Sequence, residues 1–111
     1  MSYKIEYYNK IKFYIGLNAK GNFDIIDLSD SYDLWFHIDN KPSCHVIAFI
    51  PNNIDDKNMK YIIEHGAKLC KNNSKYKLEK VKVIYTTIEN VKKTKTIGSV
   101  EISNEKSIFV T

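Results

Sequence analysis

Arginine is missing from the 111 residues, so all 17 basic side chains are lysines. The protein therefore cannot make the bidentate guanidinium contacts that suit phosphate or guanine, and a polyanion would have to be held by ammonium groups. Alanine is scarce as well, whereas asparagine, isoleucine and tyrosine are abundant. This bias is typical of an AT-rich genome, such as that of a virus or a parasite.

Cysteine and long apolar runs are also scarce. Cys44 and Cys70 are the only cysteines, and they form no CxxC pair. No run approaches the roughly 18 apolar residues of a membrane span, and the N-terminal MSYKIEYYNKIKF carries too many charges for a targeting segment. We expect free thiols, a reducing compartment such as the cytoplasm, no membrane association, and one domain over residues 1–111.

Lysine is concentrated in one part of the chain. Residues 57–95 contain 11 lysines and three glutamates, a local net charge of +8, whereas residues 1–56 have a net charge of −3. A basic half of this kind predicts an acidic partner such as nucleic acid. A lysine-rich solvated surface with no partner explains the same charge equally well, so charge alone leaves both interpretations open.

The apolar periodicity predicts an α+β domain with a mostly antiparallel sheet of about six strands built from hairpins. One main amphipathic helix is expected at about 55–72, because its apolar residues follow the i, i+3, i+4 pattern. Residues 16–22 read as a loop, 24–33 as holding one helical turn, and 89–96 as a basic loop. The predicted strands are 4–8, 10–16, 34–39, 45–50, 80–86, 97–103 and 107–111, the last two paired as a hairpin about residues 104–105.

Two histidines and a cysteine flank the turn within residues 33–50, DLWFHIDNKPSCHVIAFI. His37, Asp39, Cys44 and His45 are close in sequence, but no pair has the spacing of zinc ligands. Cys44 would need His37 as its base in catalysis, because adjacent residues of a strand point to opposite faces and His45 is its neighbour. The residues therefore favour neither an enzyme nor a metal or cofactor site.

Nucleic-acid binding has more support. The lysine face of the predicted helix leads into KNNSKYK, and NVKKTK adds a second basic loop. Trp35, His37, Tyr76 and Tyr85 offer stacking surfaces among these charges. Strand alternation nevertheless predicts that only one of Trp35 and Phe36 points inward, and core is the favoured place for Trp35.

Four segments resemble, in order, motifs of the NFACT-R domain, found in the ribosome quality-control factors of the NFACT family and as a stand-alone module in a coiled-coil-containing eukaryotic protein. DLWFHIDNKPSCHVI is similar to D-x-W-F-H followed by P-G-S-H-V. GLNAKGN resembles G-R-N-x-x-Q-N, VIYTTIENVKK resembles V-x-Y-T-x-x-x-x-V-x-K, and IGSVEI with SIFV resembles the closing strands. The resemblance covers about residues 13–111.

Departures from these motifs make the chain more similar to the stand-alone members. Leu17 replaces an arginine, Phe23 an aspartate, and Ser43-Cys44 a glycine-serine pair. The large N-terminal domain and coiled coil of the ribosome factors have no counterpart in these residues, so recruitment of tRNA is not carried over. The resemblance implies an RNA-binding module, and a stand-alone relative is also linked with DNA.

The resemblance also implies roles for individual residues. Trp35 and Phe36 would be structural, whereas His37, Pro42 and His45 would shape a polar surface at the turn. Lys92 and Lys93 would be the basic pair of the family's lysine loop.

We therefore predict a non-enzymatic module that binds RNA, tRNA or ribosomal RNA, in translation or ribosome quality control, with ribosome association expected and DNA as a second possible partner. The alternatives are an adaptor that docks an acidic protein and, with less support, a histidine-dependent enzyme. The predicted contact residues are Lys68, Lys71, Lys75, Lys92, Lys93 and Lys95 for phosphate, with His37, Lys41, Ser43 and His45 at the turn.

Overall fold

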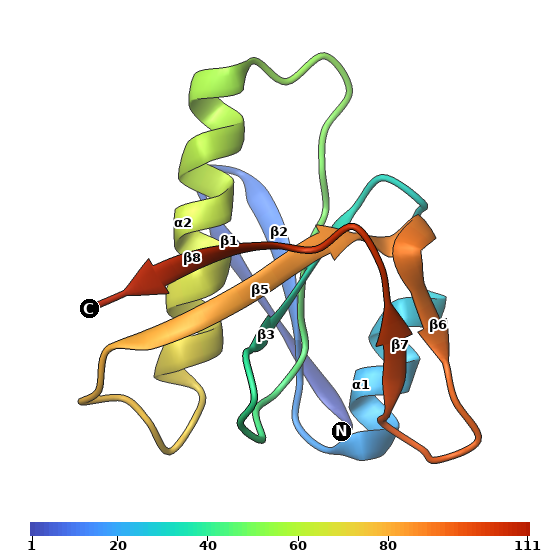
Figure 1. Cartoon of the computed structure of the whole chain (residues 1–111). Helices are drawn as coiled ribbons and strands as arrows, with labels where there is room; N and C mark the ends of the chain where they lie inside the picture. Colours follow the sequence, from blue (N-terminus) through green and yellow to red (C-terminus); the bar gives the residue numbers. More distant parts are fainter.

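The computed structural model describes all residues 1–111 and contains two sheets and two helices (Figure 1). Six strands form an antiparallel sheet in the order β1-β2-β4-β3-β5-β8, and β6 and β7 form a separate two-stranded ribbon. The predicted α+β class is confirmed. The elements are β1 (Tyr3–Tyr8), β2 (Ile11–Gly16), α1 (Ala19–Asp27), β3 (Leu34–Ile38), β4 (Val46–Ala48), α2 (Asp56–Asn72), β5 (Val81–Thr87), a 3-10 turn (Ile88–Asn90), β6 (Val91–Lys93), β7 (Val100–Ile102) and β8 (Lys106–Val110).

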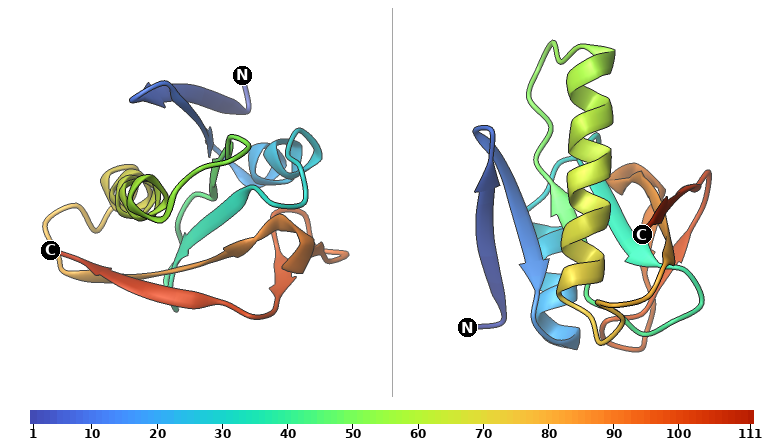
Figure 2. Two further views of the ribbon diagram at one scale, coloured as in Figure 1. Left: turned by 90° about the horizontal axis from the view of Figure 1, so that it is seen from above. Right: turned by 90° about the vertical axis from the view of Figure 1, so that its left-hand side faces the viewer.

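The six-stranded sheet is covered on both faces. Helix α2 packs against β2, β3, β4, β5 and β8 on one face. Helix α1 and the β6–β7 ribbon lie on the other, as the view from above in Figure 2 shows, with the sheet passing between the two helices. The central strands therefore contribute side chains to two separate apolar cores.

Trp35 and Phe36 are both buried, which corrects the expectation that only one of them points inward. Phe36 is fully buried in the core under α2, whereas Trp35, which is 2% exposed, lies in the core under α1 and the ribbon. Alternation does place them on opposite faces, but a sheet covered on both sides makes each face an interior. The continuous apolar run of β4 has the same cause, because β4 lies between β2 and β3.

The end of the chain pairs differently from the predicted hairpin about residues 104–105. Strand β7 pairs with β6, through Val91–Ile102 and Lys93–Val100, while β8 pairs with β5 in the main sheet. The segment predicted as a basic loop thus supplies β6. Val91, Val100 and Ile102 explain the choice, because they cover Trp35 and Ile25 on the second face.

Helix α1 occupies a region that the sequence predicted largely as loop. Asn18 caps it, because its side chain accepts a hydrogen bond of 2.8 Å from the amide of Gly21. Gly21 suggested a loop, but in the structure it allows α1 to lie close to the N-terminal backbone. A Cβ at this position would lie 1.7 Å from the carbonyl oxygen of Ser2. The glycine lets the backbone just before β1 approach the helix closely.

Helix α2 matches the predicted helix closely and is capped by Asp55, whose carboxylate accepts a hydrogen bond of 2.8 Å from the Asn58 amide. Its buried face includes Gly66, where a Cβ would lie 2.4 Å from the ring of Phe36. Since Phe36 is fully buried, its ring cannot swing into solvent to make room. The glycine thus sets how closely α2 approaches the sheet.

Gly66→Ala tests this close approach. In an open helix position the change would stabilise the fold by about 0.5–1 kcal/mol, whereas overpacking against Phe36 should lower the free energy of unfolding by about 1–3 kcal/mol. Urea unfolding of the wild type and the variant measures the difference. A matched Lys60→Ala change on the exposed face of α2 should have little effect, and stabilisation by Gly66→Ala would show that α2 is free to shift away from the sheet.

Candidate nucleic-acid interface

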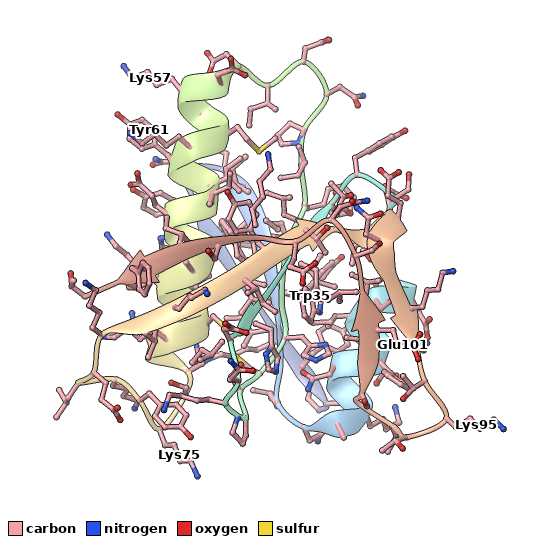
Figure 3. All side chains as sticks on the ribbon, in the orientation of Figure 1. Trp35, Lys57, Tyr61, Lys75, Lys95 and Glu101 are labelled. Carbon is pink, nitrogen blue, oxygen red and sulfur yellow. The ribbon has the colours of Figure 1, made fainter.

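Four connecting segments meet at one end of the molecule and enclose a depression of about 660 Å³. They are the β2–α1 connection, the β3–β4 turn, the segment after α2 and the β6–β7 loop. Figure 3 shows Lys75 and Lys95 extending from this end, far from Lys57 and Tyr61 at the other end of α2. The lining residues are Ile15, Gly16, Leu17, Asn18, Ala19, Asn22, Pro42, Ser43, Cys44, Asn73, Ser74, Lys75, Ile97, Gly98 and Ser99.

The lining carries a lysine but no carboxylate. Its polar groups are amides and hydroxyls, and Lys75 is its one charged side chain. The first turn of α1, which contains no acidic residue, forms part of the wall. Backbone N–H groups at a helix N-terminus carry partial positive charge. The depression is therefore suited to an anionic or polar ligand, and unsuited to a cation.

A network around Asn22 fixes the β3–β4 turn to α1 and β2. The side-chain oxygen of buried Asn22 accepts a hydrogen bond of 3.0 Å from the His45 amide, and the Gly16 amide donates to the His45 carbonyl at 3.0 Å. A Cβ on Gly16 would lie 2.0 Å from the Asn22 oxygen. Glycine is needed there to admit the carboxamide that holds the wall of the depression in place.

Two lysine ammonium groups lie over the same aromatic ring beside the depression. The Nζ of Lys41 lies 4.7 Å from the ring centre of Tyr76, and that of Lys75 lies 5.9 Å from it. Neither lysine forms an ion pair. Asp39, in the same turn as Lys41, is paired with Lys82, and Glu79 borders a second hollow together with Lys75. The ring thus brings together two positive charges that form no ion pair.

His37 and His45 lie on one face of the hairpin and pack against Trp35, so they do not form the exposed polar surface that the resemblance implies. Their ring centres are 5.4 Å apart, and both rings contact Trp35, His37 stacked on it and His45 edge-on. His45 is only 3% exposed, so it shapes the turn from within and presents no polar tip to solvent. His37 is half-buried, and its Nδ1 donates to the Ile38 carbonyl at 2.6 Å.

Burial keeps both histidines uncharged at neutral pH. Desolvation, helped by the nearby His37, lowers the pKa of His45 to about 3, and Nδ1 of His45 has no hydrogen-bond partner. Desolvation also lowers the pKa of His37, against the hydrogen bond to Ile38. Neither group therefore supplies positive charge to a phosphate, and their contribution is to the shape of the turn.

The other predicted phosphate contacts fall in different places. Lys71 is 7% exposed, and its ammonium donates to the Lys77 carbonyl at 2.6 Å, so it ties down the segment after α2. Lys68 is exposed but borders a separate hollow between α2 and β8, where Glu64 is its neighbour. Neither reaches the depression.

The β6–β7 ribbon holds the remaining three predicted lysines. Lys93 forms an ion pair of 2.5 Å with Asp27 of α1, and Lys92 lies opposite Glu101 in the register of the ribbon. Lys95 is exposed in the loop beside Ile97 and Gly98 and has no acidic partner. Of the ten predicted residues, the structure thus gathers Lys41, Ser43, Lys75 and Lys95 around the depression, with His37 and His45 behind the turn.

Sequence reasoning missed the amide-lined part of the wall. Asn18 carried a usable signal, because asparagine before a short apolar-periodic segment is a common helix cap. Asn22 and Asn73 carried none, since their placement depends on the packing of α1 and on the turn after α2. No three His, Cys, Asp or Glu side chains are grouped so as to hold a metal ion, and none of the helices has the length and apolarity needed to cross a membrane.

Fold and site together define a small α+β module with a depression that contains one lysine and is lined by amides, a surface that suits a phosphate-bearing polymer. Comparison with known protein families identifies the family to which the module belongs. The model of the NFACT protein RNA binding domain matches residues 3–104, and the chain belongs to this family. The resemblance found in the sequence is thereby confirmed.

The curated relatives are named coiled-coil domain-containing protein 25. The chain is 33% identical to the Danio rerio protein over 103 residues and 30% identical to the Mus musculus protein over 102 residues, in each case with 87% of this chain covered. It spans 49% of each relative, about half of their length. This agrees with the expected similarity to the stand-alone members.

A solved structure shares the fold. The C-terminal part of the fibronectin/fibrinogen-binding protein from Streptococcus suis superposes with a TM-score of 0.79. The two chains are 23% identical, and the match covers 92% of this chain and 41% of the other.

The buried His45 predicts an acid-dependent loss of stability. Its pKa in the folded state lies below the value of about 6.5 in the unfolded chain, so the unfolded state alone binds the proton as pH falls. The free energy of unfolding should therefore drop by about 2 kcal/mol between about pH 7 and pH 5 from this group. Urea unfolding at both pH values should show a smaller drop for His45→Gln, and an equal drop would contradict the assignment.

Proposed function

We propose that this module binds RNA through the end of the molecule that carries the depression. The observation that carries the proposal is a depression with one lysine, Lys75, and no carboxylate in its lining. Lys41 and Lys95 lie within two residues of lining residues in the chain, and none of the three lysines forms an ion pair. Membership of an RNA-binding domain family supports the same conclusion. The end that carries Lys57 offers lysines as well, but there Asp55 and Asp56 lie beside them.

The geometry suggests how a nucleotide would be held. The depression of about 660 Å³ falls within the range of small-ligand pockets. Lys75 and the start of α1 would receive a phosphate, and the amides of Asn18 and Asn73 would offer hydrogen bonds to a base or a ribose hydroxyl. Such a site favours an unstacked nucleotide in a loop or single strand over the regular groove of a duplex.

The lack of arginine bears on the affinity. Ammonium groups act as point charges and do not make bidentate contacts, so binding depends strongly on ionic strength. Three lysine–phosphate contacts on a single strand correspond to a slope of about −2 for log K against log salt. Binding is therefore expected to be modest at physiological salt.

The cellular context is part of the proposal. We propose that the RNA is a transfer or ribosomal RNA, met in the cytoplasm during translation or ribosome quality control, and that the module works in association with the ribosome. These RNAs expose single strands and loops, whose unstacked nucleotides are the kind of ligand that the depression would bind. Single-stranded DNA, which has the same phosphates without the 2′-hydroxyl, is the natural competitor.

The test is a triple change of Lys41, Lys75 and Lys95 to glutamine. Fluorescence anisotropy with labelled tRNA, single-stranded RNA, single-stranded DNA and duplex DNA, repeated across a salt series, measures affinity and slope. We expect the wild type to prefer the two RNA probes. We expect the triple variant to lose at least tenfold in RNA affinity at low salt and to flatten the slope by about 2.

A matched variant controls for net charge. Lys10, Lys57 and Lys60 changed to glutamine removes the same charge from the opposite end, where Asn9, Asn58 and Tyr61 border a different hollow. This variant should keep most of the RNA affinity. Equal losses in the two variants would show a diffuse surface charge and no localised site. Absence of binding to every nucleic acid at low salt would overturn the proposal and favour the adaptor interpretation.

A further inference from the structure

The two cysteines, distant in sequence, meet behind the wall of the depression. Cys44 lies in the β3–β4 turn, and Cys70 lies in the last turns of α2. The thiol of Cys70 donates to the carbonyl oxygen of Cys44 at 3.5 Å and lies 3.7 Å from the hydroxyl oxygen of Ser43. Both thiols are free. The fold therefore places the Cys70 thiol against the backbone of Cys44, a proximity that nothing in the sequence spacing indicates.

The surroundings of the two thiols differ in the way that a reactive pair requires. Cys44 is partly exposed and lines the depression, so a small solute reaches it, whereas Cys70 is fully buried behind it. The interaction with the Cys70 side chain lowers the pKa of Cys44, and the same interaction, together with burial, raises the pKa of Cys70. Thiolate character and access thus coincide at Cys44.

We propose that Cys44 and Cys70 form a redox modification site, at which a hydroperoxide converts the pair into an intramolecular disulfide. The Cys44 thiolate attacks the peroxide, so that an S–O bond forms, the O–O bond breaks, and the leaving oxygen takes a proton to give water or an alcohol. The Cys70 sulfur then attacks the Cys44 sulfur, the S–S bond forms, and the sulfenic oxygen leaves as water with the Cys70 proton. The peroxide is reduced by two electrons and the two thiols are oxidised by two.

The disulfide would clamp the turn to α2. The two positions are 26 apart in the sequence, and the stretch between them includes β4 and most of α2, so the bond closes a long loop that the unfolded chain would otherwise leave open. Pro42, Ser43 and Cys44 form one wall of the depression, and Asn73, Ser74 and Lys75 form another. Oxidation would fix these walls to each other. The proposal does not depend on RNA binding.

The experiment exposes the dilute full chain to a small excess of hydrogen peroxide and quenches it with an alkylating reagent. Intact mass spectrometry should show the loss of two hydrogens and no alkylation, and peptide mapping should recover Cys44 joined to Cys70 in monomeric protein. The thermal unfolding midpoint should rise by about 10 °C on oxidation and return on reduction. Stable sulfinic acid at Cys44 with an alkylatable Cys70, two unreacted thiols, or an unchanged midpoint would each overturn the proposal.

Two variants separate the roles of the thiols. In Cys70→Ser the sulfenic acid at Cys44 should persist and be trapped by dimedone, because its resolving partner is gone. In Cys44→Ser the remaining buried thiol should stay unoxidised under the same exposure. If circular dichroism shows that Cys70→Ser does not fold, the wild type and Cys44→Ser carry the test, and rapid oxidation of Cys70 in Cys44→Ser would contradict the order of attack.

Discussion

Burial of both faces of the β2–β4–β3 strands is the constraint on which the rest of the structure depends. Trp35 and Phe36 are adjacent, yet each is enclosed in a different core, so neither face of the sheet can be left to solvent. Helix α2 covers the Phe36 side and approaches closely because Gly66 carries no side chain. Helix α1 and the β6–β7 ribbon must then cover the Trp35 side. The separate β6–β7 ribbon and the short helix α1 follow from this requirement.

The same requirement assembles the candidate site. Elements on opposite faces of the sheet end near one another at the β3–β4 turn, so the start of α1, the end of α2 and the β6–β7 loop all border one depression. The turn itself is rigid, since Asn22 and Gly16 hold both backbone groups of His45, and the two histidines pack on Trp35. A surface formed by loops is thereby given the fixed geometry of a scaffold.

Local pattern predicts local structure here and fails where distant segments compete. The period of 3.6 found α2, and alternation found β1, β2 and β5, because these signals depend on neighbouring residues. The partners of β7 and β8 could not be read locally. Strands that are adjacent in the sequence usually pair as a hairpin. Here β7 pairs with β6 instead, because this pairing buries Val100 and Ile102 against Trp35. Gly21 was interpreted as part of a loop and Lys71 as a phosphate contact for a related reason. Their contacts with Ser2 and Lys77 exist only in the folded chain.

Most of the lining of the depression lies in connections between elements or in the first turns of α1, and only Ile15 and Gly16 belong to a strand of the main sheet, β2. Connections tolerate substitution and insertion far better than a doubly buried sheet does. The segment after α2 and the β6–β7 loop lie outside the Asn22 network, so their length or chemistry can change without breaking the hydrogen bonds that hold the β3–β4 turn. The architecture thus separates the doubly buried sheet, which tolerates little change, from the connections around the depression, which can diverge. Proteins with the same strands can therefore carry, at this end of the molecule, surfaces of different shape and charge.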